Sequence, residues 1–154
     1  MGLAKEKPLY DPPTDYEDDD YLWLYEQIEL LRLKRFGELD LPNLIEELED
    51  MGREQRRALE SSYRLLLAHL LKWQFQRQMR SASWEITIDR ERDHILGRER
   101  YSPSLKAQAK NIVNDVFRRA VKEAATETGL PKSAFPAECP WTLDQLRDED
   151  FLPE

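Results

Sequence analysis

Residues 105–129 read LKAQAKNIVNDVFRRAVKEAATETG, and this stretch does most to decide the fold. Its apolar side chains recur at the spacing of one helix face, and Ser102-Pro103-Ser104 supplies a capping residue and a proline at its start. Gly129 and Pro131 mark its end. We therefore predict one amphipathic helix here, whose apolar stripe consists of Leu105, Ala109, Ile112, Val113, Val116, Phe117, Ala120, Val121 and Ala124.

Upstream segments show the same periodicity. We predict helices over about 21–36, 41–80 and 84–97, the last capped by Ser83, and a short helix over 143–147 capped by Thr142. Gly52 interrupts the second of these and indicates either a kink or a break between two helices. The apolar series of this long segment is Leu44, Ile45, Leu48, Met51, Leu59, Leu66 and Trp73.

The first predicted helix is apolar on more than one side. One face carries Tyr21, Leu24, Tyr25, Ile28 and Leu31, whereas Trp23, Leu30 and Leu33 lie elsewhere on the helix. Such a helix is either central in its fold or covers a second surface, such as a dimer partner.

Composition supports the all-α class. The 154 residues include only five glycines, and long segments are rich in Leu, Glu, Arg and Ala, which favour helix. We predict a compact bundle of about four main helices, with an extended N-terminal tail and a proline-rich C-terminal segment carrying the short helix. Residues 1–19 are expected to form a flexible acidic tail, and residues 20–154 a single helical domain.

Charge is unevenly distributed along the chain, whose net charge is −8. Residues 1–50 carry fifteen acidic and five basic side chains, whereas residues 51–100 carry seven acidic and eleven basic ones, ten of them Arg. We expect the acidic first third to pack beside the basic middle third. The alternative is an external anionic partner for these arginines.

The chain shows no targeting or anchoring signal. The N-terminus has no apolar stretch, and no apolar run approaches the roughly 20 residues of a membrane span. The single cysteine, Cys139, excludes an intramolecular disulfide and has no pattern of a nucleophile around it, so we expect a buried bystander. We therefore predict a cytoplasmic protein that requires no cofactor and does not bind membranes.

Several local strings occur together in a family-specific order. They include LDLPNL at 39–44, HLLKW at 69–73, SPSL at 102–105, CPWT at 139–142 and DFLP at 150–153. In this order the chain, over roughly residues 15–153, resembles the bacterial domain-of-unknown-function family number 29. The resemblance implies a compact helical fold in a stand-alone bacterial protein, and it brings no activity or catalytic residue.

A few polar residues are candidates for chemistry. His69 lies on the apolar face of the long helix, where we expect a core histidine bonded to Glu46 or Glu47; the alternative is a metal ligand. Glu91 and His94 have the Glu-x-x-His spacing of bundle metal sites, although the stretch from Asp89 to Asp93 is more simply a solvated helix face. The weak metal candidates are therefore His69, Glu91 and His94.

Cations and aromatic residues mix near the end of the long helix, as on nucleic-acid surfaces. The weak binding candidates are His69, Lys72, Trp73, Arg77 and Trp84. An acidic net charge disfavours nucleic acid as a partner.

No phosphate loop, His-Glu-x-x-His, paired cysteines or nucleophile elbow is present, which disfavours catalysis. We predict a non-enzymatic interaction or regulatory module acting through a protein partner or as a homodimer. The alternatives are a metal-dependent enzyme with a His/carboxylate site, and binding of an anionic ligand or nucleic acid by the Arg-rich second helix.

Overall fold

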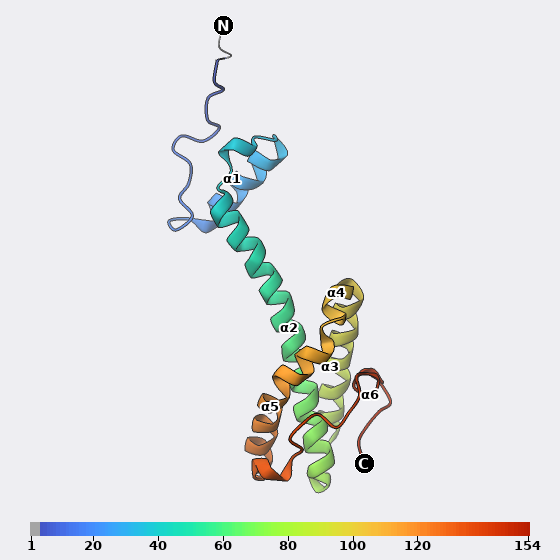
Figure 1. Cartoon of the computed structure of the whole chain (residues 1–154). Coiled ribbons are helices and arrows are strands. Elements are labelled where there is room, and N and C mark those ends of the chain that lie inside the picture. Colours follow the sequence, from blue (N-terminus) through green and yellow to red (C-terminus); the bar gives the residue numbers. More distant parts are fainter. Residues whose placement is uncertain (1–3) are drawn as a thin grey trace. The chain divides into compact units, whose positions relative to one another are not determined.

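The computed structural model describes residues 4–154, which form helices and connecting segments without any strand (Figure 1). The predicted all-α class with four main helices is confirmed. The main helices are α1 (Asp20–Arg32), α2 (Leu41–Phe75), α3 (Ala82–Tyr101) and α5 (Ala109–Thr128). The shorter elements are η1 (Phe36–Glu38), η2 (Arg77–Met79), α4 (Pro103–Lys106), η3 (Lys132–Ala134) and α6 (Leu143–Arg147).

Contacts between Cα atoms divide the chain into two compact units. The N-terminal unit ends at Arg53, and the C-terminal unit comprises Glu54–Glu154. The predicted division into a tail of residues 1–19 and one domain of residues 20–154 stays a prediction.

The hydrophobic core of the C-terminal unit joins three helices. The C-terminal part of α2 contributes side chains spaced as predicted, and α5 contributes most of its predicted stripe. Ile88 and Ile95 of α3 complete the helical contribution, while Phe135 and Leu146 from the C-terminal segment close the core. The fully buried members from α2 and α5 include Leu59, Tyr63, Leu66, Leu67, Leu70, Leu71, Ile112, Val116 and Ala120.

Helix ends follow local chemistry. Gly129, at φ 75°, ends α5 in the left-handed region that favours glycine. The Thr142 side chain accepts a hydrogen bond from the Gln145 backbone N–H, and the Gln145 side chain accepts one from the Thr142 N–H, which forms a capping box. The predicted short helix 143–147 is confirmed.

Five predicted boundaries were wrong. α1 ends at Arg32 rather than near residue 36, and α3 continues to Tyr101 rather than ending near residue 97. The helix expected from Ser102 onward is two helices, because Gln108 N–H bonds to the Leu105 carbonyl three residues back and so ends the α-helical pattern of α4. The cap of α3 is Ser81 rather than Ser83, since the Ser81 side chain accepts from Trp84 N–H. α2 continues without a break through Gly52 and ends at Phe75 rather than near residue 80.

Within residues 4–154, no helix combines the length and the apolar character that crossing a bilayer requires.

Candidate functional site

The buried face of α1 is partly polar. Trp23 and Leu30 are buried together with Glu26 and Gln27. The Glu26 carboxylate accepts hydrogen bonds from the backbone N–H and the hydroxyl of Thr14, at 2.9 and 2.8 Å. Because these polar groups have partners, their burial is tolerated and fixes the side of α1 that faces the unit.

Asp40 ties this buried face to the start of α2. Its carboxylate accepts from Trp23 Nε1 at 2.9 Å and from Asn43 Nδ2 at 2.8 Å, and its backbone N–H donates to Gln27 Oε1 at 2.8 Å. The hydrogen bond from Asn43, followed by that from Trp23, lowers the pKa of Asp40 against the opposing effect of burial. Asp40 therefore remains an anion that holds α1 and α2 in place.

The opposite face of α1 is left exposed and apolar. Tyr21, Leu24, Tyr25 and Leu31 all lie on it, and the rings of Tyr21 and Tyr25 are in contact, with centroids 5.0 Å apart. The spacing of these apolar residues is typical of a helix face that packs in a hydrophobic core. The sequence predicts that this helix covers a second surface, such as a dimer partner. Within the described chain, nothing covers this exposed face.

The first turns of α2 extend this exposure. Leu41, Ile45 and Leu48 recur at the spacing of one helix face and are all more than half exposed. Of fifteen large apolar side chains exposed among residues 4–154, eleven lie between residues 21 and 51. We call these eleven the apolar set: Tyr21, Leu22, Leu24, Tyr25, Leu31, Leu33, Phe36, Leu41, Ile45, Leu48 and Met51.

The total exposed area of the apolar set is comparable with the area that an interface buries. A half-exposed large side chain offers on the order of 80 Å², so the set presents roughly 900 Å². A standard interface buries about 800 Å² on each partner. The size therefore fits a protein–protein interface.

The unit that carries the apolar set is acidic. Residues 1–53 carry fifteen acidic and six basic side chains. The Tyr16 hydroxyl donates to the Glu47 carboxylate, and this bond, with some desolvation, raises the pKa of Tyr16 to about 12. A small hollow between Tyr16, Tyr21, Leu24 and Glu47 brings apolar and acidic side chains of α1 and α2 together. The candidate interface is thus apolar with an acidic border.

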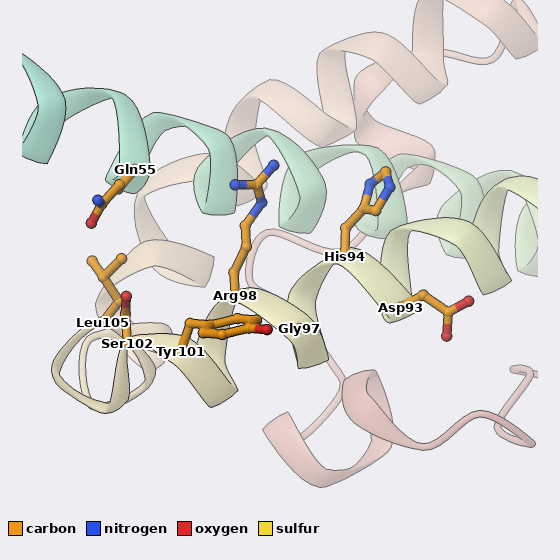
Figure 2. Close-up of a pocket in the computed structure, with 8 residues that line it drawn as sticks. All are labelled: Gln55, Asp93, His94, Gly97, Arg98, Tyr101, Ser102 and Leu105. Atoms are coloured by element: carbon orange, nitrogen blue, oxygen red, sulfur yellow. The ribbon is translucent and has the colours of Figure 1, made fainter.

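A second hollow, of about 430 Å³, lies in the C-terminal unit between α2, α3 and α4. Figure 2 shows His94 and Arg98 projecting from α3 toward α2, where Gln55 lies, while Asp93 is turned away from them. Glu91 Oε2 lies 3.4 Å from His94 Nδ1, so the structure brings this predicted pair together. No group of three His, Cys, Asp or Glu side chains able to hold a metal occurs within residues 4–154.

His69 occupies a half-buried position on α2, and the expected bond to Glu46 or Glu47 was wrong. Its Nδ1 lies 2.8 Å from the carbonyl of Leu65, one turn back on the same helix. Burial is the main cause that lowers the pKa of His69, and the charge of Lys72 acts in the same direction.

This lowered pKa predicts a dependence of stability on pH. The unfolded chain, in which histidine titrates near pH 6.5, binds more protons than the folded chain below that pH. The free energy of unfolding of the wild type should therefore decrease as the pH falls from about 7 to 5. Urea denaturation across this range should show a smaller decrease for His69→Gln than for the wild type. His94→Gln, at the other and more exposed histidine, is the control; equal slopes for wild type and His69→Gln would contradict the prediction.

The binding candidates near the end of α2 lie in two separate contacts. Lys72 is buried, with its Nζ 4.9 Å from the ring centroid of Trp84 and its ammonium bonded to Glu127. Trp73 instead packs under the guanidinium of Arg80, 4.7 Å from the ring centroid. Arg77 is exposed in η2.

Cations of α2 pair with carboxylates of α5 in a ladder. The α2 members are eight residues apart, about two helical turns, so they share one face. The pairs are Arg56–Asp115, Arg64–Glu123 and Lys72–Glu127. These carboxylates belong to the last third of the chain, so for these three cations the expected pairing with the acidic first third was wrong.

Buried charges on α3 were missed by the sequence interpretation. Glu91 and Arg92 belong to the stretch interpreted as a solvated face, yet they are 4% and 1% exposed. Glu99 is 2% exposed and accepts from the Tyr63 hydroxyl and from Arg147. These side chains of α3 are buried because the C-terminal segment, which contributes Arg147, covers them. No local spacing signals that contact.

Cys139 is half-buried, as expected of a bystander, with Sγ 3.5 Å from the Trp141 carbonyl oxygen. Burial raises the pKa of its thiol and so keeps it protonated.

Residues 16–152 match a family model described as "Domain of unknown function DUF29". Comparisons with curated proteins and with solved structures gave no match.

Proposed function

The chain belongs to the family described as domain of unknown function DUF29, and we propose that it is a protein-interaction module that works as a homodimer. The apolar set on α1 and the first turns of α2 is the surface that a second copy covers. The observation that carries the proposal is the orientation of α1, which buries Glu26 and Gln27 and leaves its apolar face exposed.

A second copy fits this surface by charge as well as by size. The acidic border of the apolar set needs a basic counterpart, and residues 54–154 carry seventeen basic and sixteen acidic side chains. Several cations of this unit, among them Arg118 and Lys122, have no carboxylate within 4.0 Å in the part of the chain that the structure describes. One chain therefore carries both members of a complementary pair of surfaces, which favours a symmetric dimer.

The two alternatives have weaker support. Anion binding by the second helix would have few free cations to use, because Arg56, Arg64 and Lys72 pair with α5. Arg57 is exposed and has no carboxylate within 4.0 Å in the described part of the chain. A metal-dependent enzyme would need a third ligand beside Glu91 and His94. We further propose that the module is bacterial and cytoplasmic; the single free cysteine is compatible with a reducing compartment.

An isoleucine pair tests the homodimer. Ile45 belongs to the apolar set, and Ile86 on α3 is similarly exposed but lies outside it. We expect Ile45→Glu to raise the dissociation constant of the dimer by about 30-fold, the effect of removing an interface hot spot. Ile86→Glu should leave it unchanged. Light scattering after size-exclusion chromatography measures the mass, and far-UV circular dichroism checks that both variants are folded.

A wild-type chain that is monomeric at concentrations of tens of micromolar would overturn the homodimer. If Ile45→Glu and Ile86→Glu changed the dissociation constant equally, the apolar set would not be the surface through which the dimer forms.

A further inference from the structure

The ladder between α2 and α5 neutralises one side of α5 and leaves the other side positive. Asp115, Glu123 and Glu127 are engaged by cations of α2. Arg118, Arg119 and Lys122 lie on the exposed side of α5, and none of them has a carboxylate within 4.0 Å in the described part of the chain. Arg119 and Lys122 also line a neighbouring hollow with Glu123 and Glu127 of their own helix, although they form no ion pair with these carboxylates within 4.0 Å.

A groove gathers these cations. Its volume is about 730 Å³, and its lining includes Arg118, Arg119 and Lys122 of α5 and Lys132 of η3, with no acidic residue. Phe135, which is buried in the core, and Val121 provide an apolar floor. Like the three cations of α5, Lys132 has no carboxylate within 4.0 Å among residues 4–154. A concave wall of four such cations on an apolar floor is a site for a ligand with several negative charges.

The N-terminal unit carries a segment of the opposite charge. Glu17, Asp18, Asp19 and Asp20 are consecutive, exposed, and without a cationic partner in the described structure. The Asp19 side chain is used as the cap of α1, where it accepts from Leu22 N–H. Glu17, Asp18 and Asp20 keep their carboxylates free for another surface.

We propose that this acidic run, Glu17–Asp20, of one copy docks into the cationic groove of a second copy. The inference rests on the proposed homodimer. It adds how the two copies are aligned and why one copy selects a second copy as its partner. In a two-fold symmetric dimer each copy provides one run and one groove, so the contact is made twice. The charges select the partner and orient it, while the apolar set provides most of the affinity.

Two charge reversals test the contact. The groove variant is Arg118→Glu/Lys122→Glu, and the run variant is Glu17→Lys/Asp18→Lys, which spares the capping Asp19. Each variant alone should raise the dissociation constant of the dimer at least tenfold, because each copy then opposes like charges twice. The control is Lys106→Glu/Lys110→Glu, which changes the net charge by the same amount as the groove variant but lies outside the groove lining. It should have little effect on the dissociation constant.

Mixing the two variants is the decisive experiment. In a mixed dimer the native run meets the native groove, and the reversed run meets the reversed groove, so both contacts are attractive again. Light scattering should show that the mixture regains the wild-type dissociation constant, whereas neither variant does so alone. If a run docked into the groove of its own chain, only the combined variant in one chain would be rescued, and the proposal would be overturned.

The remaining outcomes also decide. A dimer that Ile45→Glu dissociates but that neither charge reversal weakens would overturn the docking and leave the homodimer intact. If the groove variant lost binding of a single-stranded DNA probe and kept its dimer, the groove would be assigned to nucleic acid instead. Added salt should weaken the wild-type dimer more than it weakens the groove variant, since exposed charges are screened.

Discussion

A Glu99→Ala variant will lose about 3–5 kcal/mol of the free energy of unfolding, the cost of removing one member of a buried charge pair. The Glu99 carboxylate accepts from Arg147 Nε at 2.9 Å and from the Tyr63 hydroxyl, which joins α3, α6 and α2. Burial and the bond to Glu99 together raise the pKa of Tyr63. Without Glu99 a buried hydroxyl and a guanidinium lose their common partner.

Urea denaturation of the full chain measures this loss. The control is Asp93→Ala, an exposed acidic position on the same helix, where we expect a change within about 0.5 kcal/mol. The triple variant Tyr63→Phe/Glu99→Leu/Arg147→Met should recover most of the stability, because replacing the whole cluster leaves no unpaired group. A loss for Glu99→Ala as small as that for Asp93→Ala would show that water replaces the missing bonds.

The helices that could be predicted from the sequence are those whose signals are local. The stripe of α5, the stop at Gly129 and the Thr142 cap depend on residues within one or two turns, and all three are confirmed. The break at Gln108 was not predicted. A single hydrogen bond from the Gln108 N–H to the Leu105 carbonyl ends α4, and neither a glycine nor an interruption of the apolar spacing marks this position.

Periodicity finds the faces of a helix but does not say which face is covered. For α1 the longer apolar face is exposed, and the face with Trp23 and Leu30 is buried. The polar residues beside them, Glu26 and Gln27, find partners in Thr14 and Asp40, which are distant in sequence. The candidate interface therefore follows from tertiary hydrogen bonds, although the sequence already indicates a second apolar surface on this helix.

A related reason explains why the sequence did not predict the cationic groove. The sequence interpretation assigned a possible anion site to the Arg-rich second helix, since its arginines are numerous. The structure pairs three cations of that helix with α5 and leaves unpaired the less conspicuous cations of α5 itself. Counting charges along a chain cannot show which of them remain after pairing between helices.

Arg92 is the second residue whose replacement should be strongly destabilising, and its effect should be local. Arg92 is 1% exposed and has no carboxylate within 4.0 Å among residues 4–154. Its Nε donates to the Leu146 carbonyl at 2.9 Å, and its Nη2 donates to that of Gln145 at 3.4 Å. Burial lowers the pKa of Arg92, although the nearest acidic groups oppose this. The side chain thus attaches the end of α6 to α3 through backbone carbonyls.

An Arg92→Met variant keeps the length of the side chain and removes all its donors. The Leu146 carbonyl then loses its bond from Arg92, and the Gln145 carbonyl keeps only the 3.3 Å bond from the Asp148 N–H. Each buried carbonyl that loses its bond costs about 1–3 kcal/mol. We expect α6 and the residues after it to open, with amide hydrogen exchange at 143–152 at least tenfold faster than in the wild type. Arg100→Met, at an exposed arginine of α3, should leave exchange there unchanged. Because a lysine cannot form the same fork, Arg92→Lys should retain only part of the protection. Uniformly faster exchange over the whole C-terminal unit would show instead that Arg92 supports the core as a whole, and unchanged exchange at 143–152 would show that it does not hold the segment.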